Sequence, residues 1–354
     1  MALNNHQKEK ISFEVIKTLV TRFDNFPEDA SNNRNAPFHE AFLKAFADKL
    51  EGKVSDTPFF ISLSSWLHGL NTTLGQTFFE NIACHLSNGE KREYTSKRLG
   101  NLQITRTQKN NVSKIITDLS NSSATPNLNA ENNLIFQDTD TELVNAIDFS
   151  ADVFIEDMDS ITAIELKSVK PNSGEMRGEK QKILEGKSAL YRHFPGKQIS
   201  FYIGFPFDPT VNPLTNSVTS YDKTKFLDSI INMTKFFAPN ETLVASELWD
   251  KLSGKANTME DILDIINTIS STEFLNKFRL LTDNSKRETP EFKRQLAEWN
   301  IFSEIELINK NDKILQKIWG NTTLIRIYNK TSFDNKGNYN FDRYHVLKNL
   351  LKEK

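Results

Sequence analysis

Residues 150–170 read SADVFIEDMDSITAIELKSVK, and this stretch decides the fold. Two runs, 151–156 and 161–169, are rich in the β-branched and aromatic side chains that favour strands. The residues between them, 157–160, are mostly polar, which is typical of a turn. The sequence therefore predicts two antiparallel strands joined as a hairpin.

The register of this hairpin depends on the length of its loop. With a loop of two or four residues, the numbers of opposed residues sum to 317, which sets Asp152 across from Glu165. An odd loop length or a bulge shifts that pairing. On the second strand Glu165 and Lys167 are two apart and share a face, whereas Ile164 and Leu166 point to the other face. We therefore expect Asp152, Glu165 and Lys167 to converge.

These three side chains predict a particular chemistry. Charges that face inward on an apolar strand are costly unless they pair or bind a metal ion. Carboxylates without histidine or cysteine suit a hard cation such as Mg²⁺. Such an ion polarises a phosphodiester and lowers the pKa of bound water, while Lys167 orients that water or stabilises developing negative charge. The alternative is an ordinary hairpin whose Glu165 and Lys167 lie on a solvated face.

Helical segments surround the hairpin. A third apolar run at 199–205 follows an amphipathic segment at 179–193, and this order of strands and helix indicates an α/β core. A short run at 324–328 is typical of a lone strand. Further helices are predicted at 11–26, 38–50, 74–87, 226–237, 243–252, 259–269 and 290–301.

We expect three regions in a chain of 354 residues, which exceeds the usual size of one domain. Residues 1–73 are predicted to be a helical N-terminal region. Residues 74–210 are predicted to be the catalytic core, with a surface insertion near 101–138 that is rich in Asn, Ser and Thr. Within this insertion we expect one short helix at 112–119 and a loop at 120–132. Residues 211–354 are predicted to be a mainly helical region for DNA recognition or dimerisation.

Asp152 together with Glu165-Leu166-Lys167 resembles the PD-(D/E)xK nuclease superfamily. Its members place an acidic residue on one strand and Glu-x-Lys on the next, in a mixed sheet flanked by helices. Ala151 stands where the superfamily often has proline. The run from Glu165 to Lys180, ELKSVKPNSGEMRGEK, and the helical run 74–80, LGQTFFE, are similar to type II restriction endonucleases of the TdeIII kind.

The resemblance implies further roles for particular residues. It implies that Mg²⁺ is held by Asp152, Glu165 and the carbonyl group of Leu166. In the superfamily a helix before the first strand often supplies another carboxylate, and Glu80 matches that position. On a helical wheel Glu80 falls about 60° beyond the apolar arc, which places it at the edge of a cleft or in solvent.

The segment that follows the second strand is basic. Between Glu165 and Lys197 there are eight lysines and arginines against four glutamates, in a chain whose net charge is −2. We expect phosphates or base edges of DNA to be contacted here. The candidate residues are Lys170, Asn172, Ser173, Arg177, Lys180 and Lys182. The alternative for the lysines is a solvated helix face with ordinary pairs of charged residues.

The cysteine content and the lack of long apolar runs indicate the cellular compartment. Cys84 is the sole cysteine, which excludes an internal disulfide and a zinc site with several thiolates and fits a reducing environment. The first ten residues are polar, and no run of ~18 apolar residues occurs. We therefore expect a soluble protein of the cytoplasm.

The resemblance implies a type II restriction endonuclease that hydrolyses double-stranded DNA at a short sequence, with a GGNCC-like site suggested by the TdeIII kind. It further implies a homodimer, because palindromic sites match two-fold symmetry, and a DNA methyltransferase as functional partner. Two alternatives stay open from the residues: a structure-specific repair or recombination nuclease of the same fold, and a non-catalytic DNA-binding protein. Intact Asp152, Glu165 and Lys167 argue against the last.

Overall fold

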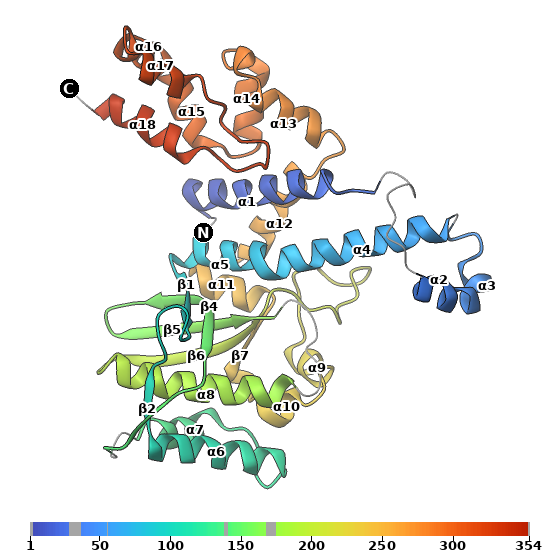
Figure 1. The fold of residues 1–354 in the computed structure, drawn as a ribbon, viewed down its shortest axis with the longest axis vertical. Helices are drawn as coiled ribbons and strands as arrows, with labels where there is room; N and C mark the ends of the chain where they lie inside the picture. The colour runs from blue at the N-terminus through green and yellow to red at the C-terminus, as the bar shows by residue number, and fades with distance from the viewer. Residues whose placement is uncertain (1–2, 28–36, 55, 138–140, 168–174, 353–354) are drawn as a thin grey trace. The chain divides into compact units, whose positions relative to one another are not determined.

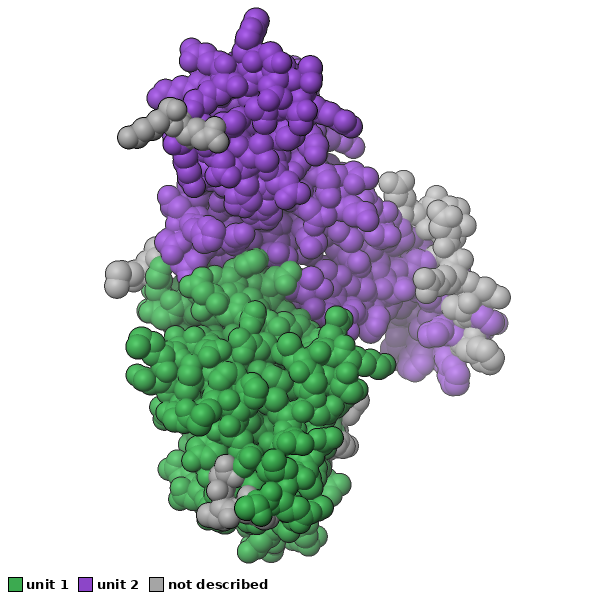
Figure 2. Space-filling model, turned by 60° about the vertical axis from the view of Figure 1, so that its left-hand side comes forward, with its two compact units in different colours: residues 1–3, 79–262 green, residues 4–78, 263–354 purple. Residues whose placement is uncertain are grey.

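The computed structural model describes residues 3–27, 37–54, 56–137, 141–167 and 175–352. The chain divides into two compact units, shown in separate colours in Figure 2. The first comprises Met1–Leu3 and Phe79–Ile262, and the second comprises Asn4–Phe78 and Leu263–Lys354. None of the helices in these described ranges has the length and apolar content that a membrane crossing requires.

A mixed five-stranded sheet forms the centre of the first unit (Figure 1). Its order is β1-β4-β5-β6-β7; the pairs β1–β4 and β4–β5 are antiparallel, and β5–β6 and β6–β7 are parallel. The strands are β1 (Glu90–Tyr94), β4 (Phe149–Glu156), β5 (Ser160–Leu166), β6 (Gln198–Phe205) and β7 (Thr242–Val244). The predicted α/β core is therefore present.

The β4–β5 hairpin has the predicted register. Asp157 N–H donates to the Ser160 carbonyl at 2.9 Å, which leaves two residues at the centre of the loop. Val153 lies opposite Ile164, and the following pairs continue that alignment to the loop. Because 153 and 164 sum to 317, the prediction from an even loop length is confirmed along these pairs.

Helices cover both faces of the sheet. The helix α8 (Glu175–His193) connects the parallel strands β5 and β6 and covers one face, while α5 (Phe79–Ser87) and α11 (Ser246–Ser253) cover the other (Figure 1). At Gly186 the backbone of α8 comes so close to the sheet that an added Cβ would lie 3.0 Å from the Phe201 ring. The resulting layers are helix, sheet and helix, as the α/β pattern predicts.

The region near 101–138 is not a surface insertion. It contains β2 (Gln103–Thr105), which pairs with β3 (Leu143–Asn145), and two helices, α6 (Arg106–Ser120) and α7 (Leu128–Ile135). Both helices pack on α8, and α6 buries four apolar residues, Val112, Ile115, Ile116 and Leu119. Those residues recur at helical spacing, and α6 confirms the helix predicted at 112–119, whereas α7 begins inside the loop predicted at 120–132.

The compact first unit also extends past residue 210, where the sequence places the end of the core. The strand β7 is preceded by α9 (Lys223–Asp228), α10 (Met233–Phe236) and a 3₁₀ turn at Pro239–Glu241. The sequence predicts a helix at 243–252 and misses β7. A strand of three residues is too short to show the alternation of apolar and polar side chains that identifies strands. The helix observed there is α11, which begins after the strand.

The second unit is helical. Its N-terminal and C-terminal parts share one core, in which the Phe13 ring stacks on Tyr339 at 4.3 Å and Glu9 accepts hydrogen bonds from Ser303. Residues 324–328 lie in α17 and not in a strand, because the Asn321 side chain caps the helix by accepting from Leu324 N. The remaining elements are α1 (Asn5–Phe23), α2 (Pro37–Leu43), η1 (Lys44–Phe46), α3 (Ala47–Leu50), α4 (Thr57–Thr73), a π-helical turn (Leu74–Phe78), α13 (Phe274–Thr282), η4 (Asn284–Lys286), α14 (Pro290–Glu298), α15 (Phe302–Asn309), α16 (Asn311–Ile318), α17 (Thr322–Tyr328) and α18 (Phe341–Lys352), while α12 (Thr258–Ile269) spans the boundary between the units.

Candidate active site

Asp152 lies at a β-bulge in β4. Arg92 of β1 is opposite Ala151, but Glu90, two residues earlier, is opposite Phe154, three residues later. The extra residue in β4 redirects side chains at this point, as bulges commonly do beside active sites. Beside this irregularity, the Asp152 carboxylate accepts a hydrogen bond from the backbone N–H of Leu166 at 2.8 Å. Asp152 is therefore fixed to the end of β5.

Glu165 and Lys167 lie on the same face of the sheet, as predicted. Both side chains reach α8, and Lys167 Nζ is 3.4 Å from Glu165 Oε1. The backbone N–H of Lys167 donates to Gly204 of β6 at 2.8 Å, which prolongs the sheet pairing past the end of β5. Glu165 is 7% exposed, so its charge needs partners close by.

Glu80, in the first turn of α5, approaches the same place. The Lys91 ammonium of β1 lies 2.8 Å from Glu80 Oε2 and 3.5 Å from Asp152 Oδ1. The side chain of Glu80 is 14% exposed, so it is directed to this site and not to open solvent. The structure therefore places Glu80 beside Asp152 through their shared contact with Lys91, and it places the Asp152 carboxylate on the backbone of the residue after Glu165.

The carboxylates disfavour one another's ionisation. Burial raises the pKa of Asp152, and the charge of Glu80 raises it further, while the Leu166 N–H opposes the rise. Burial also raises the pKa of Glu165, with an additional contribution from Asp152, against the lowering effects of Lys182 and Lys167. A bound cation would relieve this repulsion.

The donor set fits a hard divalent cation. Among the described residues, no group of three or more His, Cys, Asp or Glu side chains is arranged as a cage that could hold a metal ion. Mg²⁺ usually needs no such cage, since it retains several waters and binds one or two protein carboxylates. Asp152 and Glu165 supply those carboxylates, and the carbonyl of Leu166 lies between Glu165 and Lys167 in the chain. The Lys91 ammonium shows that a positive charge is already accommodated beside Asp152.

The helix α8 contributes two side chains to the site. Glu179 accepts from Lys167 Nζ at 2.9 Å and pairs with Lys182 Nζ at 2.8 Å. Lys182 in turn lies 2.8 Å from Glu165 Oε1. The sequence analysis missed Glu179 and Lys91 as site residues. The spacing of Glu179 and Lys182 on one helical face could have indicated Glu179 as a site residue. The same spacing is also typical of an ordinary helical ion pair.

Two predicted DNA contacts need correction. Lys182 does not extend toward solvent, because its ammonium is held between Glu165 and Glu179. Lys180 is fully buried, and its ammonium pairs with Glu131 and Glu241 at 2.6 and 2.7 Å. Successive helical residues differ by about 100° in direction, so Lys180 faces away from the site that Glu179 faces.

The other predicted contacts are unaffected. Arg177 is exposed in the first turns of α8. Lys170, Asn172 and Ser173 lie outside the described residues.

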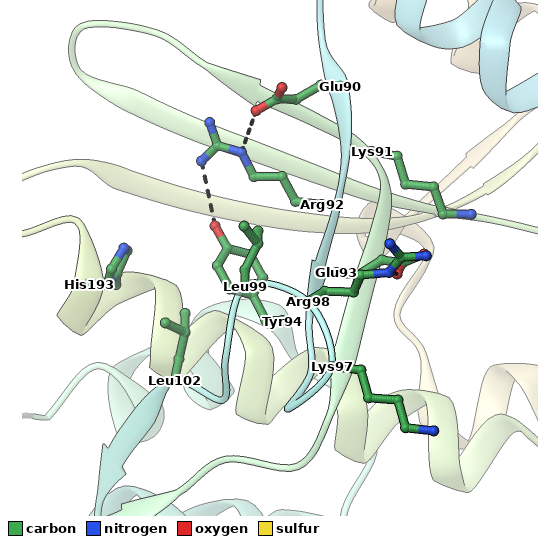
Figure 3. A pocket seen from close by; sticks show the side chains of 10 residues that line it. All are labelled: Glu90, Lys91, Arg92, Glu93, Tyr94, Lys97, Arg98, Leu99, Leu102 and His193. Atoms are coloured by element: carbon green, nitrogen blue, oxygen red, sulfur yellow. Dashed lines mark hydrogen bonds and ion pairs between the residues drawn. The ribbon is translucent and has the colours of Figure 1, made fainter.

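A basic hollow of about 880 Å³, lined by more lysines and arginines than glutamates, is shown in Figure 3. It lies over β1 and the loop after that strand, and Lys91 is common to the hollow and the carboxylate site. Lys97 and Arg98, both exposed, extend from the loop to the same side as Lys91 in Figure 3. The lining residues are Glu90, Lys91, Arg92, Glu93, Tyr94, Lys97, Arg98, Leu99, Leu102 and His193.

Residues 3–270 match the sequence model of the family described as type II restriction endonuclease, HinfI. The chain belongs to the HinfI family of type II restriction endonucleases. It is also similar to the type II restriction enzyme MjaII of Methanocaldococcus jannaschii, with 43% identity over 365 aligned residues that cover 97% of this chain and 96% of the relative.

Membership of the HinfI family confirms a type II site-specific deoxyribonuclease, as the resemblance to restriction endonucleases implied. The matching family is that of HinfI, and the resemblance to the TdeIII kind stays a prediction from the sequence. Type II restriction endonucleases generally use a divalent metal ion, in agreement with the oxygen donors of Asp152 and Glu165.

Proposed function

We propose that this chain hydrolyses phosphodiester bonds of double-stranded DNA in a PD-(D/E)xK site, with Mg²⁺ held by Asp152, Glu165 and the Leu166 carbonyl. The observation that carries the proposal is the hydrogen bond from Leu166 N–H to Asp152 at 2.8 Å. It joins the acidic residue of β4 to the segment of β5 that bears Glu165 and Lys167. The mixed sheet between helices supports the same superfamily.

The residues divide the chemistry among them. Asp152 and Glu165 would hold a Mg²⁺ ion, which would supply polarisation of the phosphodiester and a lowered pKa of bound water. Glu80 adds negative charge beside Asp152. Although burial by itself lowers the pKa of Lys167, Glu165 and Glu179 raise it well above the usual range. Lys167 would orient the attacking water and stabilise negative charge on the phosphate.

DNA contacts come from positive groups around this site. Exposed Arg177 lies in α8 two residues before Glu179, so it would be near the bond to be cut. Lys170, Asn172 and Ser173, which come after β5 in the sequence, remain candidate contacts. The basic hollow beside Lys91 gives a second place for phosphates. We further propose a homodimer on a GGNCC-like site, with a DNA methyltransferase that protects the host DNA and a mainly helical second unit that takes part in recognition or dimerisation.

Digestion of unmodified bacteriophage DNA tests this function. Purified protein with Mg²⁺ is expected to give discrete fragments, and sequencing of their ends gives the site and the cut position. Glu165→Ala and Lys167→Ala should abolish cleavage, while DNA binding with Ca²⁺ in place of Mg²⁺ persists.

Glu156→Ala is a matched control, since Glu156 lies on β4 in an exposed ion pair with Lys197. This variant should cut like the wild type. Cleavage by Lys167→Ala at the wild-type rate refutes the site, and fragments without fixed ends refute the sequence specificity.

A further inference from the structure

Four side chains close a ring of alternating charge at the end of β5. Lys167 Nζ lies 3.4 Å from Glu165 and 2.9 Å from Glu179, and Lys182 Nζ lies 2.8 Å from each of the same two carboxylates. Each ammonium therefore has two carboxylates, and each carboxylate has two ammonium groups. The four side chains are between 9% and 17% exposed, so water screens the attraction between their charges only weakly.

The two halves of the ring come from different elements. Glu165 and Lys167 belong to the catalytic strand, whereas Glu179 and Lys182 are three residues apart on α8 and share one helical face. Glu175, one turn before Glu179, adds a third carboxylate 3.3 Å from Lys167 but is more exposed. The ring therefore links the strand that carries the chemistry to the helix packed on it.

Lys180 fixes the rotation of α8 about its axis. Its buried ammonium is held by Glu131 at 2.6 Å and by Glu241 at 2.7 Å, from α7 and the 3₁₀ turn before β7. Because Lys180 follows Glu179 directly, this anchor determines where Glu179 points. Neighbouring residues that are buried and hydrogen-bonded restrict a functional side chain to a narrow range of positions.

We propose that Glu179 and Lys182 are positioning residues of the cleavage reaction: Glu179 holds the ammonium of Lys167 in place, and Lys182 orients the carboxylate of Glu165. This inference rests on the proposed roles of Glu165 and Lys167. It replaces the DNA contact predicted for Lys182 and gives a role to Glu179, which the sequence analysis left out.

The test separates positioning from DNA contact. Glu179→Gln and Lys182→Met are compared with the conservative variants Glu179→Asp and Lys182→Arg, and thermal unfolding checks each fold. Single-turnover cleavage at saturating DNA measures the chemical step. DNA affinity in Ca²⁺ at several salt concentrations measures binding. Loss of an outer partner of a metal site typically costs about 10- to 100-fold in activity, and we expect that loss for Glu179→Gln and Lys182→Met, with partial recovery in the conservative variants.

Matched controls come from the ion pair between Lys197 and Glu156, in which Lys197 Nζ lies 3.0 Å from Glu156 Oε1. Both side chains are more exposed than those of the ring. Glu156→Gln and Lys197→Met should cut within about twofold of wild type, as surface substitutions do. Arg177→Ala should lower the slope of log affinity against log salt by about 1, whereas Lys182→Met should leave it unchanged.

A second readout needs neither metal nor DNA. Acylation of Lys167 by an amine-reactive ester, followed by mass spectrometry, should be slow in the wild type and several-fold faster in Glu179→Gln. If a single variant does not fold, Glu179→Gln/Lys182→Gln removes one charge of each sign and is measured instead.

Single-turnover rates within about twofold of wild type, for folded Glu179→Gln or for the double variant, overturn the proposal. A salt slope lowered by about 1 in Lys182→Met overturns it for Lys182. If the wild type itself cuts no DNA while Lys167 acylation still responds to Glu179→Gln, the proposed function fails and the link between Glu179 and Lys167 stands.

Discussion

Lys187, in the middle of α8, is a buried ammonium whose replacement should stabilise the protein. Its side chain is 1% exposed, and Nζ has no hydrogen-bond partner among the described residues. The Phe136 ring lies beneath it, 5.9 Å from Nζ to the centroid. Burial lowers the pKa of Lys187 to about 8 from 10.5, against partial compensation by Glu241. We predict that Lys187→Met is more stable than the wild type at pH 7.

The magnitude follows from that pKa. A change of one pH unit in a pKa corresponds to about 1.4 kcal/mol, so the charged lysine costs the folded state on the order of 3 kcal/mol. Below pH 8 the lysine is protonated in both the folded and the unfolded chain, and this cost is fully present. Between the folded value of about 8 and the unfolded value of 10.5 the unfolded chain binds more protons, so wild-type stability rises with pH. Above 10.5 the cost has vanished.

Urea unfolding at pH 7, 9 and 10.5 measures the effect. The free energy of unfolding of Lys187→Met should exceed that of the wild type by roughly 1–3 kcal/mol at pH 7, and the difference should shrink through the two higher pH values. Lys114→Met, at an exposed position of α6, is the control and should show no pH-dependent difference. A constant difference across this range, or destabilisation at pH 7, refutes the reasoning, since it would mean that the ammonium is well solvated or paired.

Two further substitutions test the charges around the site. Lys180→Met leaves Glu131 and Glu241 buried without their cation, so it should reduce the free energy of unfolding by about 3–5 kcal/mol. The slope of log DNA affinity against log salt should not change. A lowered slope would show that Lys180 contacts phosphate after all. Lys91→Met removes the ammonium beside Glu80 and Asp152, so divalent ions should bind about fivefold tighter, roughly 1 kcal/mol for a partly exposed pair, in calorimetric titration with Mn²⁺. Unchanged or weaker ion binding would show that Lys91 does not compete for that place.

The β4–β5 hairpin could be predicted because its register depends on local sequence. Alternation along a strand decides that Glu165 and Lys167 share a face, and a two-residue loop decides the register of Val153 with Ile164. The bulge that directs Asp152 to Leu166 N–H was not predictable, because it depends on the pairing of β4 with β1. No pattern within β4 by itself records which residue of a distant strand will lie opposite.

The errors on α8 have a different cause. Lysines in a charged helical segment look alike in sequence, and a solvated face is their usual location. Lys180 is buried because Glu131 and Glu241, about 50 and 60 residues away, meet at its position, and Lys182 is drawn to the strand by Glu165. The sequence does not contain the long-range packing of α6 and α7 on α8 that excludes solvent from this helix.

The number of residues in the β4–β5 loop matters as much for the proposed site as the identity of its side chains. One inserted or deleted residue at Met158 or Asp159 would move β5 by one position against β4 and turn Ile164 and Leu166 toward α8 in place of Glu165 and Lys167. Asp152, Glu165 and Lys167 would still be encoded, but the proposed active site would not form. Homologous enzymes should therefore vary in the composition of this loop while keeping its number of residues, and an insertion there marks a relative that has lost its activity.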